Sequence, residues 1–182
     1  MPVSERTFEQ VVREDPDGRW ELHGGLLVRK PAMTFDHNRI AIWLAHLLLN
    51  QLDRTRYDVR TNAGHVYYSA EQYYVPDVYV IPLSLAEGLR GRQDRLEKYR
   101  APLPLVVEIW SPSTGDYDVD KKLPEYRRRG DLEIWRIHPY ERTLTAWVRR
   151  ADGGYTETVY RGGEVSSVAL PGVVIDLGSL FE

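Results

Sequence analysis

Two acidic residues lie in stretches of the sequence that otherwise have the apolar character of buried β-strands. Asp77 directly precedes the apolar run 78–81, and Glu108 lies within the run 105–110. A carboxylate among branched apolar residues is costly to bury unless it is paired, hydrogen-bonded or bound to a metal. Strand alternation allows a second interpretation, in which each acid points to solvent from a half-exposed strand. Both neighbours of Glu108 on its own side of the strand are apolar, which favours burial of this acid.

Two such carboxylates on adjacent strands could hold a hard divalent cation. Mg²⁺ prefers oxygen ligands and is commonly bound by one or two carboxylates, with waters and substrate phosphate oxygens. The bound metal lowers the pKa of a water and neutralises charge on a phosphoryl group. A positive side chain is also needed for the attacking water or the transition state. Lys122 is the candidate, because the chain has only 4 lysines beside 20 arginines. A solvated helix surface is the alternative interpretation of Lys121 and Lys122.

The composition excludes several other kinds of protein. The chain has 182 residues, no cysteine and a formal net charge of −3. Disulfide scaffolds, thiolate zinc sites, iron–sulfur clusters and cysteine nucleophiles are therefore excluded. The motifs GxGxxG, GxxxxGK[ST] and GxSxG are missing, and the five histidines lack the close spacing of zinc ligands. The length predicts one domain, residues 1–182.

Basic residues are concentrated in two segments despite the negative net charge. Residues 90–100 have a local charge of +3, and residues 121–129 have a local charge of +4. Such clusters can neutralise phosphates at a cleft. The arginines at 127–129 are equally consistent with a solvated helix C-terminus, which cations stabilise. The tyrosine pairs at 67–68 and 73–74 could stack on bases, although core packing or a subunit contact is the more ordinary role.

The elements that must position these residues alternate between helices and strands. Thr7 to Gln10 predicts a capping box that opens a helix to about Glu14. Gly24-Gly25 predicts the turn of a hairpin between strands 19–22 and 26–29. Asp36 is a candidate cap for a long helix, whose apolar stripe has helical spacing. That stripe comprises Ile40, Trp43, Leu44, Leu47, Leu48 and Leu52.

The second half of the chain predicts more strands and one further helix. The run 103–110 is the most apolar and is expected at the centre of the sheet. The helix 118–129 ends at Gly130, and Pro124 either kinks it or lies in its first turn. Further strands are predicted at 57–61, 65–69, 75–81, 132–137, 143–149 and 155–160. This order predicts a mixed α/β or α+β sheet flanked by helices.

The string Val106 to Thr114, followed by Asp118, Lys122 and Tyr126, resembles the Uma-type endonuclease family. This family belongs to the PD-(D/E)XK nuclease superfamily, and the resemblance covers nearly the whole chain in the same order. Other matching segments are Trp20 to Gly25, His37, Pro76 to Val78, Gly130 to Pro139 and Pro171 to Phe181. The resemblance implies a restriction-endonuclease-like fold, with a mixed central sheet flanked by helices and extra antiparallel strands.

The resemblance also implies a set of site residues. Asp77 matches the aspartate of the motif and Glu108 its second acid, which together form the metal pair for Mg²⁺ or Mn²⁺. The lysine of the motif would fall at Trp110, and Lys122 on the following helix matches it instead. Glu21 matches an early glutamate that is counted with the catalytic site in related nucleases, where it binds a second metal or orients a water.

Three residues depart from the family pattern without touching the metal pair, namely His23, Gly24 and His138. The implied function is a metal-dependent endonuclease that hydrolyses phosphodiester bonds in DNA. A non-catalytic nuclease fold that binds nucleic acid or acts as a scaffold is one alternative, and a small phosphoester hydrolase is another. Analogy with nucleases that cut both strands favours a homodimer.

The sequence also carries expectations about location and source. No apolar segment approaches the ~20 residues needed to span a bilayer. The first residues lack the apolar core of a signal peptide. We therefore expect a cytoplasmic protein without membrane contact. The arginine bias and the scarcity of Asn, Gln, Met and Cys fit either a thermophile or a GC-rich genome.

Overall fold

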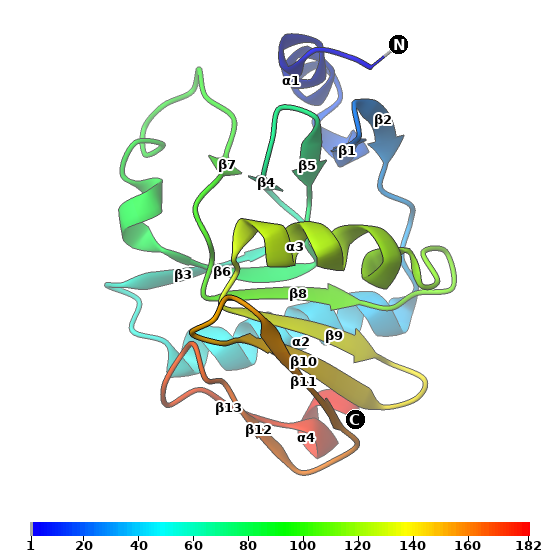
Figure 1. Ribbon diagram of the computed structural model, residues 1–182, viewed down its shortest axis with the longest axis vertical. Helices are drawn as coiled ribbons and strands as arrows, with labels where there is room; N and C mark the ends of the chain where they lie inside the picture. Colours follow the sequence, from blue (N-terminus) through cyan, green and yellow to red (C-terminus); the bar gives the residue numbers. More distant parts are fainter. Residues whose placement is uncertain (1) are drawn as a thin grey trace.

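The computed structural model describes residues 2–182 and contains two main β-sheets with four α-helices around them (Figure 1). The larger sheet has six strands, in the order β11 (Tyr155–Tyr160), β10 (Thr143–Arg149), β9 (Glu133–His138), β8 (Leu105–Ile109), β6 (Val78–Pro82) and β3 (Tyr57–Thr61). Only β8 and β9 run parallel, so this sheet is mixed. The predicted α+β architecture is confirmed.

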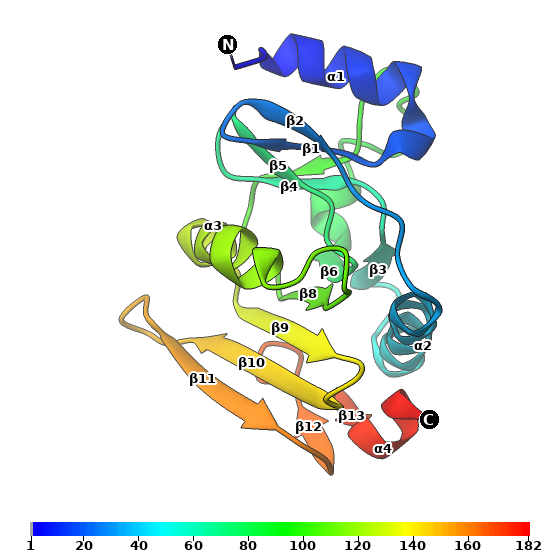
Figure 2. The ribbon, with the colours of Figure 1, turned by 90° about the vertical axis from the view of Figure 1, so that its right-hand side faces the viewer.

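The smaller sheet has five short strands. Its order is β2 (Leu26–Arg29), β1 (Trp20–His23), β5 (Gln72–Tyr74), β4 (His65–Tyr67) and β7 (Lys98–Tyr99). Helix α1 (Glu5–Glu14) covers its outer face (Figure 2) and buries Phe8 against Leu22 and Tyr73. The predicted hairpin at Gly24-Gly25 is confirmed as β1 and β2. Strands β5 and β7 are additional to the prediction.

Both faces of the larger sheet are covered, which explains the continuous apolar run in β8. Helix α2 (Phe35–Gln51) packs on one face with β12 (Glu164–Ser166), β13 (Val174–Asp176) and α4 (Leu177–Phe181). Helix α3 (Leu123–Arg129) and the smaller sheet pack on the other. Alternate residues of β6 serve the two faces, since Val78 and Val80 contact the α2 side and Tyr79 and Ile81 the α3 side. Strand β8 is interior and wholly buried, as predicted.

The helix starts differ from the sequence-based expectations. Helix α1 is capped by Ser4, whose hydroxyl accepts from the Thr7 amide, so it begins before the predicted capping box. Helix α2 is capped by Thr34 rather than Asp36. In both cases a serine or threonine with extended backbone lies directly before the helix, and its hydroxyl oxygen accepts a hydrogen bond from an otherwise unpaired backbone amide of the first turn. Trp43 points outward with 40% exposure, so the apolar stripe of α2 is narrower than predicted.

Pro124 lies in the first turn of α3, and a π-helical turn (Asp118–Lys122) leads into this helix. Gly130 ends α3 in the left-handed conformation, with φ of 81°, as its terminal role requires. Among residues 2–182, no helix combines the length and the apolar character needed to cross a membrane.

Arg129 is buried and paired inside the fold, which a count of basic residues could not reveal. Its guanidinium group is buried and pairs with Asp131, with Nε 3.0 Å from Oδ2. It also donates to the carbonyl oxygens of Tyr67, Tyr99 and Ala101 at 2.8–3.0 Å. Arg129 therefore joins the end of α3 to the smaller sheet and is unavailable to a phosphate.

Replacement of Arg129 should test this structural role. Arg129→Ala leaves the Asp131 carboxylate buried without its cation, so we expect a loss of about 3–5 kcal/mol in the free energy of unfolding. Arg128→Ala is the matched control, because Arg128 is 56% exposed and pairs with Glu125 at the surface. Its loss should stay below about 1 kcal/mol. Urea denaturation followed by circular dichroism measures both, and similar losses would contradict the assignment.

Candidate active site

The register of the larger sheet brings Asp77 and Glu108 to the same place. Strands β6 and β8 are antiparallel and Val78 pairs with Val107, so the next position along the pair joins Asp77 to Glu108. Asp77 also accepts a hydrogen bond from the backbone amide of Ile109, at 2.7 Å from Oδ2. Both acids are buried, with 1% and 4% exposure. The solvent-facing interpretation of these two acids is therefore wrong.

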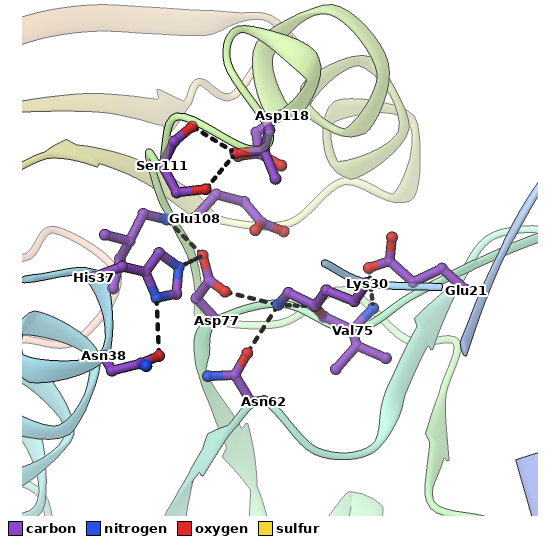
Figure 3. Close-up of polar contacts among 12 residues, drawn as sticks. Glu21, Lys30, His37, Asn38, Asn62, Val75, Asp77, Glu108, Ser111 and Asp118 are labelled. Atoms are coloured by element: carbon purple, nitrogen blue, oxygen red, sulfur yellow. Dashed lines mark hydrogen bonds and ion pairs between the residues drawn. The ribbon is translucent and has the colours of Figure 1, made fainter. Parts of the chain in front are cut away.

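Lys30 pairs with Asp77 in the interior, as Figure 3 shows. Its Nζ lies 2.6 Å from Asp77 Oδ1 and also donates to Asn62 Oδ1 at 2.9 Å and to the Val75 carbonyl at 2.7 Å. His37 approaches from the first turn of α2, with Nε2 3.0 Å from Asp77 Oδ2. These contacts hold the pKa of Asp77 well below its ordinary value despite the opposing effect of burial.

Lys122 lies among three other carboxylates. Its Nζ is 3.0 Å from Glu21 Oε1, 3.4 Å from Glu108 Oε1 and 3.6 Å from Asp118 Oδ1. The π-helical turn places Asp118 and Lys122 on the same inner side, and such turns are frequent at functional sites. Burial lowers the pKa of Lys122, but the surrounding carboxylates more than reverse this and hold it well above its ordinary value. Lys122 is therefore an ammonium ion in the interior.

Glu21 and Glu108 differ in their protonation. Burial raises the pKa of Glu21, but Lys122 and a hydrogen bond with His23 reverse the effect, and the pKa falls to about 2. Burial raises the pKa of Glu108 well above its ordinary value, because the attraction of Lys122 is opposed by the carboxylates of Asp118 and Asp77. The Tyr126 hydroxyl donates to Glu108 Oε1. Burial thus favours the neutral form of Glu108, whereas Lys122 and His23 favour the ionised form of Glu21.

The acidic groups outnumber the cations in this buried cluster. Four carboxylates, those of Glu21, Asp77, Glu108 and Asp118, surround two lysines, Lys30 and Lys122. Asp118 Oδ1 is buried without a hydrogen-bond partner, and burial raises its pKa. With all four carboxyl groups ionised the excess is two negative charges, which a divalent cation would balance, and carboxylate oxygens are the ligands that Mg²⁺ prefers. The donor set therefore fits such an ion.

The side chains are not yet arranged around a metal. Within residues 2–182, no three His, Asp or Glu side chains already form a metal-binding group. The ion pairs give the physical reason, because the Lys122 ammonium group lies where three carboxylates converge and the Lys30 ammonium group is paired with Asp77. These ammonium groups neutralise part of the negative charge that would attract a metal.

A cavity of about 220 Å³ opens onto the cluster. Glu21, Lys30, Asp118 and Lys122 are among the residues that line it. Its other walls come from the hairpin β1–β2 and from the loop before the π-helical turn, including His23, Ser113 and Tyr117. Asp77 and Glu108 do not line the cavity but contact the two lysines that do. A substrate phosphate in the cavity would therefore meet Lys30 and Lys122 first.

All four residues proposed from the sequence lie in this cluster. Asp77, Glu108, Lys122 and Glu21 come from four separate segments, yet each is buried. Lys122 pairs with Glu21 and Glu108, and the strand register places Asp77 beside Glu108. Their roles in chemistry stay predictions.

Lys30 is not identified as a site residue from the sequence, although it is one of only four lysines, which is the same signal that selects Lys122. The family string included Asp118 and Tyr126 without giving either a role. Only the geometry shows that both contact the cluster.

Comparison with known proteins gives two positive findings. The sequence model of the Uma2 family, described as "Putative restriction endonuclease", matches residues 6–178. Among solved structures, the chain is similar to one described as a "putative nuclease belonging to DUF820" from Anabaena variabilis. That likeness has a TM-score of 0.75 and 17% identity, covering 99% of this chain and 98% of the other. No curated protein matches the chain.

Two substitutions should shift thermal stability in opposite directions. The pKa of Glu108 is raised by burial, whereas in the unfolded chain this acid ionises above pH 4.5. Its burial therefore lowers the free energy of unfolding at pH values above 4.5. Glu108→Gln should therefore raise the melting temperature at pH 7 in EDTA by about 3 °C, equivalent to about 1 kcal/mol.

The pKa of Glu21 is lowered, so its ionised form stabilises the folded protein at pH values above 4.5. This contribution is lost as the pH falls toward about 2. Glu21→Gln should lower the melting temperature at pH 7.

Differential scanning fluorimetry at pH 7 and at pH 4 checks both signs. Both differences should shrink at pH 4, because the two acids then ionise less in the unfolded chain. A destabilised Glu108→Gln protein at pH 7 would show that Glu108 is ionised and satisfied in the metal-free protein.

Proposed function

The chain belongs to the Uma2 family, and from this premise we propose that it is a metal-dependent endonuclease that hydrolyses phosphodiester bonds in DNA. The observation that carries the proposal is the excess of buried carboxylates over lysines beside an open cavity. A buried, uncompensated charge is costly, and such clusters are concentrated at functional sites. The family description supports nuclease chemistry, while the metal and the DNA substrate belong to the proposal.

Asp77 and Glu108 are the proposed ligands of the metal, Mg²⁺ or Mn²⁺. When bound, the ion would supply Lewis-acid polarisation of a phosphoryl oxygen and a water with a lowered pKa. Ile109 and Lys30 fix both oxygens of Asp77. Tyr126 fixes the orientation of Glu108 through its hydroxyl.

The cavity-lining residues would act on the substrate directly. The Lys122 ammonium can donate to the attacking water or to a phosphoryl oxygen, and its charge offsets the charge that develops there. Glu21 can accept a hydrogen bond from that water and is ionised at neutral pH, because its pKa is about 2. Lys30 can neutralise a second phosphate oxygen, because it lines the same cavity.

One observation favours the alternative of a non-catalytic binding or scaffold module. Asp77 already contacts Lys30, His37 and the Ile109 amide, so both of its oxygens are occupied. A scaffold would keep this closed network and would show no affinity for a divalent ion. Isothermal titration with Mn²⁺ distinguishes the two functions, since an endonuclease of the proposed kind must bind the ion.

Nicking of supercoiled plasmid in Mg²⁺ or Mn²⁺ tests the catalytic assignment. Asp77→Asn and Glu108→Gln preserve shape but remove a ligand charge, so each should reduce the rate at least about 100-fold. Glu164→Gln, at an exposed acid of β12, is the control and should cleave at the rate of the unaltered protein. Equal rates in all four proteins would refute the assignment of the metal pair.

Lys122 can be tested separately from the metal ligands. Lys122→Met removes the ammonium group that competes for the carboxylates, so Mn²⁺ should bind more tightly while cleavage slows at least about 100-fold. Lys121→Met is the control, because Lys121 is exposed beside it, and neither quantity should change. Weaker Mn²⁺ binding in Lys122→Met would show that Lys122 supports the metal site instead of competing with it.

A further inference from the structure

A second cavity, of about 410 Å³, lies between α1, the start of β1 and the segment 93–97. Three arginines line it, namely Arg13, Arg19 and Arg95, together with the half-buried indole of Trp20. Ligand pockets commonly measure roughly 300–1,000 Å³, so this one can hold a ligand about the size of one nucleotide. Two of its lining residues, Asn62 and Val75, also contact the proposed cleavage site, where both accept hydrogen bonds from the Lys30 ammonium group.

The charge of this cavity is positive once its internal pairs are counted. Glu97 lines the cavity, but its Oε1 accepts from Arg60 at 2.5 Å and from Tyr99 at 2.6 Å. Asp15 is the other lining carboxylate, and its Oδ2 accepts from the indole nitrogen of Trp20 at 3.0 Å. The three arginines therefore face one carboxylate without a cationic partner.

Two of these arginines are free to bind a ligand. Arg13 donates to the backbone carbonyl of Asp94 at 2.7 Å. Within residues 2–182, the side chains of Arg19 and Arg95 have no hydrogen-bond or ion-pair partner, whereas Arg92 pairs with Asp94 in the same basic segment. Free guanidinium groups at a cavity suit a phosphate, because they present several donors to its oxygens.

The backbone is strained at two positions that line this cavity. Arg19 has φ of 45° and Asn62 has φ of 48°, in the left-handed region that residues other than glycine rarely adopt. Both contact Lys30, because the Arg19 carbonyl accepts from the Lys30 amide at 3.1 Å and Asn62 Oδ1 accepts from Lys30 Nζ at 2.9 Å. Two residues that line the second cavity, Asn62 and Val75, thus accept hydrogen bonds from the lysine that pairs with Asp77 (Figure 3).

We propose that this cavity binds an unpaired nucleotide, with its phosphate on Arg19 and Arg95 and its base against Trp20. Guanidinium groups recognise phosphate oxygens, and aromatic faces stack on bases of any sequence. The inference rests on the proposed function in one respect, since the nucleotide is assigned to a DNA strand whose neighbouring phosphodiester occupies the cleavage site. A free nucleotide has the same chemistry and is the other source to be distinguished.

Binding measured in EDTA tests the proposal without requiring cleavage. The pocket variant is Arg19→Asn with Arg95→Gln, because asparagine tolerates the left-handed backbone of position 19. The control is Arg54→Gln with Arg161→Gln, two exposed arginines without ion pairs among residues 2–182. Both variants lose the same charge, so a non-specific effect of net charge is removed. The probes are a fluorescent single-stranded 12-nucleotide DNA and deoxyadenosine monophosphate.

The pocket variant should bind the single strand at least about tenfold more weakly than the control variant. The slope of log affinity against log salt concentration should also be smaller in magnitude by about 1.4 than in the control variant, because two phosphate contacts at ~0.7 each are lost. A loss confined to the mononucleotide would support the site and assign it to a free nucleotide. Equal binding of both probes by pocket and control variants, with equal melting temperatures, would overturn the proposal. Failure of plasmid cleavage with this binding intact would overturn only the proposed catalytic function.

Discussion

Lys122 holds three buried carboxylates, those of Glu21, Glu108 and Asp118, within 3.6 Å of one ammonium group. Each acid comes from a different element, so this contact joins the smaller sheet, the larger sheet and the π-helical turn. Buried ion clusters of this kind seldom add net stability relative to apolar residues of the same volume. The rest of the fold must therefore provide the stability that this cluster does not, which the apolar packing on both faces of the larger sheet does.

The surrounding structure shows how that cluster is kept in place. Asp77 is fixed by the backbone of β8 through Ile109, and the smaller sheet is tied to α3 by Arg129. The left-handed residues Arg19 and Asn62 both contact Lys30. Strain and buried charge thus occur together around Asp77. Proteins tolerate such features where the surrounding packing overdetermines them, and they are concentrated at functional sites.

The sequence was sufficient to predict the residues that carry a strong local signal. Asp77 directly precedes one apolar run and Glu108 interrupts another, and strands 143–149 and 155–160 have boundaries that the structure reproduces. Contacts between distant segments could not be predicted in this way. The Lys30–Asp77 pair spans 47 residues, and whether Arg129 is buried or solvated depends on Asp131 and on backbone carbonyls of the smaller sheet. Charge counts add residues along the chain, whereas electrostatics depends on their depth and neighbours.

The basic segment 90–100 also shows that a charge count along the sequence does not reveal which side chains are free to bind a ligand. Two of its five basic side chains are already paired, because Arg92 pairs with Asp94 and Lys98 pairs with Glu5 and Glu9. Among its other arginines, Arg95 lines the second cavity together with Arg19. That cavity and the acid cluster share Lys30 through Asn62 and the Val75 carbonyl. A phosphate bound by Arg19 would therefore lie on a residue whose carbonyl accepts from the backbone amide of Lys30, the cation that balances Asp77.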